Sequence, residues 1–146
     1  MSNKQFIILL LSVLFSYSVY AGDANQIEYN GYTIHFNAYP SDHLQPNIAK
    51  AIGVKRGQSH AVVTVVVNKK NETDKAPQSV KARVKGNAFN LTGMMRRMKL
   101  RELEDKGAIY YISDFGVRQG ERLTFALSVK PDGESQEKEF KFSKQF

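Results

Sequence analysis

The sequence predicts an all-β domain, an antiparallel sandwich of seven to eight strands with one short helix. Short runs of alternating apolar and polar residues follow one another, and turn-forming residues separate them at intervals of roughly eight to twelve residues. Two of these runs are apolar on both faces, which is typical of strands that are covered on both sides. Regular spacing of this kind favours a sandwich or barrel. We expect one double-faced strand at the centre of each of two sheets.

The first 21 residues have the three parts of a secretory signal peptide. Lys4 supplies the positive charge, an apolar stretch runs from Phe6 to Val19, and Ala21 ends the segment with a small residue. We expect cleavage between Ala21 and Gly22. The alternative is an uncleaved membrane anchor, but the apolar run is shorter than the about 20 residues that a span needs. The predicted mature chain is one domain, residues 22–146.

The bulk composition constrains the compartment and the partners. The chain has no Cys, so it has neither a disulfide nor a lipid-modified N-terminal Cys, and this favours a bacterial periplasm over a eukaryotic secreted protein. The formal net charge is +7, and it becomes +6 when Lys4 is removed with the signal peptide. Outside the cytoplasm, such a domain would attract anionic lipid head groups, polysaccharides, peptidoglycan carboxylates or acidic proteins. Solubility alone would also explain the charge.

The N-terminal part of the domain predicts a hairpin and the helix. Two alternating runs, 26–29 and 32–39, flank Asn30-Gly31, the pair of residues that favours a tight type I′ turn. Residues 46–53 have Pro at the first helical position and Gly at the C-cap, and they predict a two-turn helix. Ile48 and Ile52 are four residues apart, so we expect them to pack together onto the sheet.

The middle of the chain predicts three extended segments. Residues 60–69 form the first run that is apolar on both faces. Residues 78–91 alternate between apolar and polar side chains and predict one long strand, in which Gly86 marks a bulge or bend. Residues 95–104 continue in extended conformation until the turn at 105–107.

The C-terminal part predicts the remaining strands. Residues 108–115 form the second double-faced run, and residues 122–130 place Leu123, Phe125, Leu127 and Val129 on one face. Residues 135–146 complete the fold, with Phe140 and Phe142 on one side.

Several short motifs occur together in a familiar order. They are Leu44-Gln45-Pro46, the stretch from Ala49 to Gly57 that contains Gly53-Val54-Lys55-Arg56-Gly57, Ala61-Val62-Val63, Leu100-Arg101-Glu102-Leu103 and Ala108-Ile109-Tyr110-Tyr111. With these motifs the chain resembles domain-of-unknown-function family 4426, small exported gammaproteobacterial proteins. The resemblance covers essentially the whole mature chain. It implies an immunoglobulin-like β-sandwich in the periplasm, and it brings no activity and no functional residues.

Basic side chains form the candidate binding site. They cluster in two places, Arg96, Arg97, Lys99 and Arg101 in one, and Lys81, Arg83 and Lys85 on one strand face in the other. If these strands pair, the seven residues would merge into one positive surface, and its guanidinium groups could bind phosphate or carboxylate bidentately. The alternative is that these charges protect sheet edges from aggregation.

The sequence does not predict catalysis, a metal site or a cofactor. His35, His43 and His60 lack the spacing of a zinc site. No Cys nucleophile and no Gly-x-Ser-x-Gly motif are present. The alternative is an enzyme with an unusual active site formed by Asp42, His43, Arg56 and Tyr111, which would require a pocket that joins them.

These observations favour a non-enzymatic binding or protein-interaction module of the cell envelope, located in the periplasm. We expect it to contact an envelope protein by strand addition, or an anionic envelope component through the basic residues. A third possibility is a membrane-surface protein held by charge alone. Nucleic acid is not an expected partner, because the signal peptide directs the chain away from it and no aromatic residues interleave with the basic ones. The mature chain has no predicted transmembrane segment.

Overall fold

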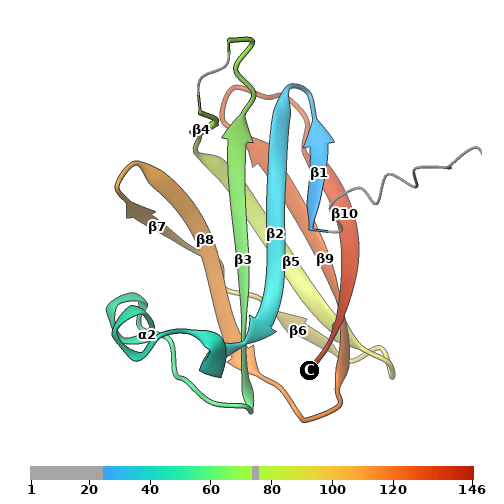
Figure 1. Cartoon of the computed structure of the whole chain (residues 1–146). Helices are drawn as coiled ribbons and strands as arrows, with labels where there is room; N and C mark the ends of the chain where they lie inside the picture. Colours follow the sequence, from blue (N-terminus) through green and yellow to red (C-terminus); the bar gives the residue numbers. More distant parts are fainter. Residues whose placement is uncertain (1–24, 74–75) are drawn as a thin grey trace, which may run out of the picture.

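The computed structural model describes residues 25–73 and 76–146, and these form two antiparallel sheets packed face to face. Figure 1 shows the larger sheet in front of the smaller one. The predicted all-β sandwich is therefore confirmed. The predicted signal peptide lies outside the described residues. Both sheets and their apolar cores are built from residues 25–146.

The larger sheet has the strand order β1-β2-β3-β8-β7, with β4 paired to the end of β3. Its strands are β1 (Gln26–Tyr29), β2 (Tyr32–Pro40), β3 (His60–Lys69), β4 (Gln78–Ser79), β7 (Arg101–Asp105) and β8 (Ala108–Gly116). The smaller sheet has the order β10-β9-β5-β6. Its strands are β5 (Ala82–Asn90), β6 (Met95–Arg97), β9 (Arg122–Pro131) and β10 (Lys138–Gln145).

Two of the predicted long strands are each divided between the sheets. The run 78–91 supplies β4 to the larger sheet and β5 to the smaller one, and the run 95–104 supplies β6 and then β7. The chain crosses over at Val80–Lys81 and at Met98–Leu100. Both sheets bury their apolar side chains in the same core, so the alternation continues through each crossing. This is why the described residues contain ten strands rather than seven to eight.

Gly86 does not mark a bulge, because β5 pairs with β9 in an uninterrupted register from Ala82 to Asn90. Its lack of a side chain serves packing instead. A Cβ at this position would clash with the Leu127 side chain and lie 3.2 Å from Cε of Met98. The backbone of β5 therefore lies close beneath two apolar side chains.

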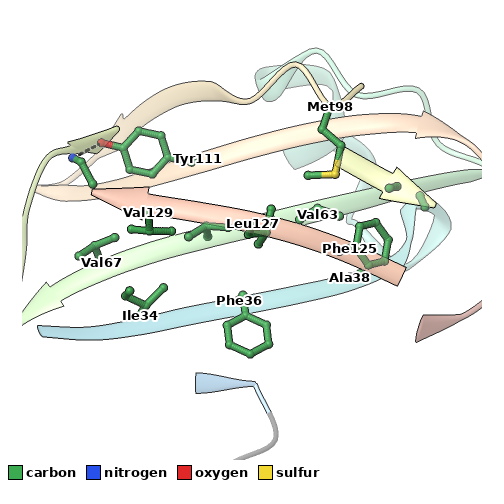
Figure 2. Packing of buried hydrophobic residues seen from close by; sticks show 14 of the residues in the cluster. Ile34, Phe36, Ala38, Val63, Val67, Met98, Tyr111, Phe125, Leu127 and Val129 are labelled. Carbon is green, nitrogen blue, oxygen red and sulfur yellow. Dashed lines mark hydrogen bonds between the residues drawn. The ribbon is translucent and has the colours of Figure 1, made fainter. Parts of the chain in front are cut away.

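The main core lies between the two sheets (Figure 2). Leu123, Phe125, Leu127 and Val129 of β9 are buried, as predicted from their alternation. They face the buried side chains of β2 and β3. The ring centroid of Phe36 lies 4.8 Å from that of Phe140 and 4.7 Å from that of Phe142, so β10 packs against β2 through aromatic contacts.

The two double-faced strands are neighbours in the larger sheet, and the prediction of one in each sheet is wrong. β3 and β8 pair directly, from His60 opposite Gly116 to Val65 opposite Tyr111. Their outer face is covered by the β2–β3 connection, and Val54 of this connection forms a second buried cluster with Val62 of β3 and Ile112 of β8. A covering layer of this kind explains why these two strands are apolar on both faces.

The β2–β3 connection contains a short 3-10 helix, η1 (Ser41–His43), and the predicted helix, α2 (Pro46–Ile52). Gly53 ends α2 with φ of 69°, the left-handed conformation of a Gly C-cap. Ile52 packs against the second cluster. The expectation for Ile48 is wrong, because its side chain is 45% exposed, whereas Ala49 is buried. The helix is thus anchored through Ala49 and Ile52.

Candidate functional site

Three of the seven predicted basic residues are engaged in contacts and do not join a common surface. The Arg96 guanidinium binds the Glu121 carboxylate at 2.7 and 3.3 Å and donates to the carbonyl oxygen of Gly116. Arg101 donates to the carbonyl oxygen of Ile52 and binds Asp114. Lys81 Nζ lies 3.3 Å from the Glu102 carboxylate. These three side chains hold parts of the fold together.

Three others lie together on the outer face of the smaller sheet. Arg83 and Lys85 are exposed on β5, where they alternate with residues that point into the core. Arg97 lies on β6 opposite Asn87, two residues beyond Lys85 on the same face. Arg83 and Lys85 of one predicted cluster and Arg97 of the other therefore lie on a common surface. Lys99 is exposed in the crossing between β6 and β7.

The neighbouring strands add basic residues that were not among the predicted site. β9 presents Arg122 and Lys130, and β10 presents Lys141, all on the face away from the core. We call the outer-face set the basic face: Arg83, Lys85, Arg97, Arg122, Lys130 and Lys141. None of the six forms an ion pair with a described residue. The alternation of β9 could have identified Arg122 and Lys130, but only the strand order places them beside β5.

The centre of the basic face is a shallow depression of about 400 Å³. Small side chains, Asn87, Ala126 and Ser128, form its floor, and Lys85 and Lys141 stand on opposite sides of it. Ser128 Oγ is buried and has no hydrogen-bond partner among the described residues. Glu139 is the acidic residue at the rim. An anionic group could therefore approach the backbone of the sheet between two ammonium groups.

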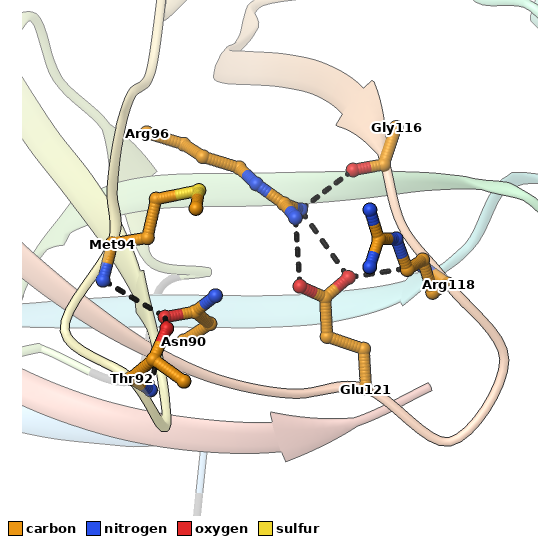
Figure 3. Close-up of polar contacts among 7 residues, drawn as sticks. All are labelled: Asn90, Thr92, Met94, Arg96, Gly116, Arg118 and Glu121. Atoms are coloured by element: carbon orange, nitrogen blue, oxygen red, sulfur yellow. Dashed lines mark hydrogen bonds and ion pairs between the residues drawn. The ribbon is translucent and has the colours of Figure 1, made fainter.

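Glu121 lies close to the basic face, but its charge is compensated (Figure 3). Burial raises the pKa of Glu121, whereas the backbone N–H of Arg118 and the Arg96 guanidinium lower it, and the lowering effects prevail. The carboxylate is thus ionised and fully paired. Arg118 and Arg122, which flank it in the chain, are exposed.

The turn between β5 and β6 combines internal hydrogen bonds with exposed apolar side chains. Asn90 Oδ1 accepts hydrogen bonds from the backbone N–H of Thr92, from its hydroxyl and from the N–H of Met94 (Figure 3). The turn nevertheless presents apolar side chains to solvent: Leu91 is 83% exposed, Met94 62% and Met95 53%.

The four groups of the alternative enzyme site are not brought together. Arg56 donates to the carbonyl oxygen of Asp42, and His43 lies beside it, all in the β2–β3 connection. Tyr111 instead lies in the core between the sheets (Figure 2). Its hydroxyl accepts from the Ala82 N–H at 2.7 Å and donates to Glu102. Burial, together with the Glu102 charge, raises the pKa of Tyr111. Its contacts are those of a structural residue.

A second hollow, a groove of about 540 Å³, lies between α2 and the outer face of β7 and β8. Its lining is mostly apolar and includes Leu44, Ile48, Leu103 and Ile112. No group of three or more His, Asp or Glu residues with metal-binding geometry occurs in ranges 25–73 and 76–146. Within the same ranges, no helix has the length and apolar character needed to cross a bilayer.

Comparison with known proteins supports the fold and identifies the family. A family model described as "Domain of unknown function (DUF4426)" matches residues 26–146. A crystal structure of a DUF4426 family protein from Pseudomonas aeruginosa PAO1 is 31% identical, covers 83% of this chain and 92% of that one, and superposes with a TM-score of 0.69. No curated protein matches the chain.

Two structures of FetP from uropathogenic Escherichia coli strain F11 share the fold alone. A copper-bound FetP variant is 10% identical, with 83% of this chain and 91% of that chain covered and a TM-score of 0.54. FetP as isolated after recombinant expression in the periplasm is 11% identical, with 83% and 90% covered and a TM-score of 0.53.

Proposed function

Since this chain belongs to the DUF4426 family of domains of unknown function, we propose its function from its own surface: a non-enzymatic, periplasmic binding module that holds an anionic component of the cell envelope on the basic face. The observation that carries this proposal is the set of six cations on one face of the smaller sheet, none in an ion pair with a described residue.

Protection of sheet edges accounts for only part of this arrangement. Edge strands carry Lys and Arg to prevent pairing with other chains. In the smaller sheet the edges are β6 and β10, which supply Arg97 and Lys141 to the basic face. Arg83 and Lys85 lie on β5, which pairs with β6 only from Asn87 to Phe89, so they also lie beside an unpaired stretch of strand edge. Arg122 and Lys130 lie at the two ends of β9, the strand between β5 and β10. Edge protection does not explain Arg122 and Lys130, and the presence of six cations without an ion pair to a described residue on one face favours a ligand.

The chemistry of the face suits phosphate or carboxylate groups. Arg97 offers a planar fork that binds such groups bidentately, and Lys85 and Lys141 offer point charges across the depression. The small floor residues allow an oxygen to approach closely. The six like charges repel one another, and a bound polyanion would relieve this repulsion. Lipid head groups and peptidoglycan both carry such groups.

The predicted signal peptide supports a periplasmic location, and so does the fold shared with FetP, which was isolated from recombinant expression in that compartment. An envelope module also fits the lack of Cys, since the fold is held by its two apolar clusters without disulfides.

The test compares two variants with the same net charge. The protein is residues 22–146, because both sheets and both cores lie within 25–146. The face variant carries Arg83→Gln, Lys85→Gln and Arg97→Gln. The control variant carries Lys50→Gln, Lys55→Gln and Lys106→Gln, three exposed cations elsewhere. Each protein is sedimented with phosphatidylglycerol-containing vesicles and, separately, with peptidoglycan sacculi.

We expect wild-type protein and the control variant to bind at least one of the two probes and the face variant to lose that binding by about tenfold or more, since each cation near an anionic surface contributes about 1 kcal/mol. Equal losses in both variants would mean that net charge alone drives binding, and would overturn the proposal. Absence of wild-type binding to both probes would overturn it as well.

A further inference from the structure

We propose that the anionic component is the surface of a phospholipid bilayer, and that the turn between β5 and β6 inserts Leu91, Met94 and Met95 into it. This inference rests on the proposed function, because the basic face supplies the electrostatic attraction. We call residues 90–95 the apolar tip.

The apolar tip exposes more apolar surface than the fold requires. Leu91, Met94 and Met95 account for three of the five large apolar residues that the described chain exposes, and they lie within five consecutive positions. A single exposed Leu is common on protein surfaces, whereas a cluster at one turn marks an interaction site. On β5, Phe89 lies opposite Met95 on the same outer face and extends the apolar patch toward the basic face.

The tip is held in one conformation, and this reduces the entropy that insertion would cost. The three hydrogen bonds to Asn90 Oδ1 close the turn, and the N–H of Gly93 donates to the Asn90 carbonyl oxygen at 3.0 Å. Gly93 has φ of 79°, a conformation that other residues rarely adopt. The backbone N–H groups of Thr92, Gly93 and Met94 all donate within the turn, so insertion would not leave these three donors unpaired in an apolar medium.

Cations surround the apolar tip. A shallow hollow between the tip and the β8–β9 loop is lined by Leu91 and Thr92 on one side and by Arg118 and Arg122 on the other. Glu121, the acidic residue in that loop, is neutralised by Arg96. Arg97 follows Met95 on the outer face of β6. The guanidinium groups of Arg97, Arg118 and Arg122 therefore lie next to the apolar tip. If the tip inserts into a bilayer, these groups would lie at the level of the lipid phosphates.

The size of the patch favours a bilayer over a protein partner. A stable protein interface buries roughly 800 Å² on each side. The apolar tip offers three side chains on a convex turn. A bilayer accepts a small insertion of this kind, because its binding energy adds the buried apolar area to the attraction of cations for anionic lipids.

A Trp probe tests insertion directly, since the chain contains no Trp. Leu91→Trp in residues 22–146 places the probe at the tip, and Ile48→Trp places it at a second exposed apolar position, on α2. Emission is recorded with vesicles of phosphatidylethanolamine and phosphatidylglycerol, with and without brominated lipid, and with phosphatidylcholine vesicles. We expect a blue shift and bromolipid quenching for Leu91→Trp on the anionic vesicles only, and neither effect for Ile48→Trp.

A second variant measures the apolar contribution without a probe. Leu91→Ser with Met94→Ser should weaken vesicle binding by about tenfold or more, because burying one such side chain changes binding by that factor. The residual binding should become more sensitive to salt, since only charge remains.

The outcomes separate the two proposals. If vesicles bind the Leu91→Trp protein without shifting its emission, the protein is held by charge alone, so the insertion is wrong and the proposed function stands. If the emission shifts with detergent-extracted envelope proteins and not with vesicles, the tip contacts a protein, and the lipid assignment is wrong. If binding is seen only to peptidoglycan sacculi, the basic face has a different anionic target, and again only the lipid assignment fails.

Discussion

Arg96 on β6 and Glu121 in the β8–β9 loop form a two-pronged ion pair, with nitrogen–oxygen distances of 2.7 and 3.3 Å. Both side chains are largely shielded from solvent, and Arg96 also reaches the Gly116 carbonyl oxygen at the end of β8. The pair therefore ties an edge strand of the smaller sheet to a strand of the larger sheet, next to the apolar tip. It fixes the tip relative to Arg118 and Arg122, on which the proposed membrane contact depends.

The first prediction concerns the strength of this pair. Arg96→Gln and Glu121→Gln should each lower the free energy of unfolding by about 2 kcal/mol, because a hydrogen-bonded charge loses its partner. The double variant should lose less than the sum of the two, and urea denaturation of all four proteins measures the difference. Strictly additive losses would show that the two side chains do not stabilise each other.

The second prediction concerns the pH dependence of stability. Burial raises the pKa of Glu121, but the Arg118 N–H and Arg96 lower it by more in the folded protein. A lowered folded-state pKa means that the stabilisation is complete above the pKa of the unfolded carboxyl group, about 4.3, and is lost as the pH falls through the folded-state value. The stability difference between wild type and Glu121→Gln should therefore shrink in acid. A difference that does not change between neutral and acidic pH would contradict the shift.

The third prediction concerns the first crossing between the sheets. Ala82 begins β5 just after the chain leaves the larger sheet, and its N–H donates to the Tyr111 hydroxyl at 2.7 Å. Tyr111→Phe leaves this buried N–H without a partner and should cost about 1–3 kcal/mol in thermal or urea unfolding. The control is Tyr110→Phe, whose side chain is 37% exposed, and it should be close to neutral. Equal stability of the two variants would remove the structural role assigned to Tyr111.

The fourth prediction concerns the close approach at Gly86. Gly86→Ala would push a methyl group into the Leu127 side chain and to 3.1 Å from the Ala126 carbonyl oxygen, and it should destabilise the fold by about 1–3 kcal/mol. Gly116→Ala is the matched control, since the added atom there is 3.9 Å from its nearest neighbour. If calorimetry gives the two variants the same melting temperature, the packing over Gly86 is looser than described.

The tight turns and the alternating strands could be predicted from the sequence because their causes are local. Asn30 and Gly31 have φ of 47° and 80°, the positive values of a type I′ turn, which Asn and Gly adopt more readily than other residues. Leu123 and Phe125 are buried because period-two alternation places them on one face. These elements depend only on neighbours along the chain.

The sheet crossings and the partners of the basic residues could not be predicted, because they depend on strand order. The alternation around Lys81 is the same whether the chain continues in one sheet or passes to the other. Arg96 and Arg97 are adjacent in sequence, yet Arg96 meets Glu121 from a distant loop, whereas Arg97 lies exposed on the outer face. Ile48 shares its helical spacing with Ile52, but the orientation of α2 exposes it. Only the packing of distant segments distinguishes these cases.

The most direct test of the basic face is an amide NMR titration of residues 22–146 with short-chain phosphatidylglycerol below its micelle concentration. We expect the largest chemical-shift changes around Lys85, Arg97 and Lys141, with a second group at the apolar tip, and neither group of changes with short-chain phosphatidylcholine. Changes confined to the groove between α2 and β7, or spread evenly over all exposed Lys and Arg residues, would contradict this expectation.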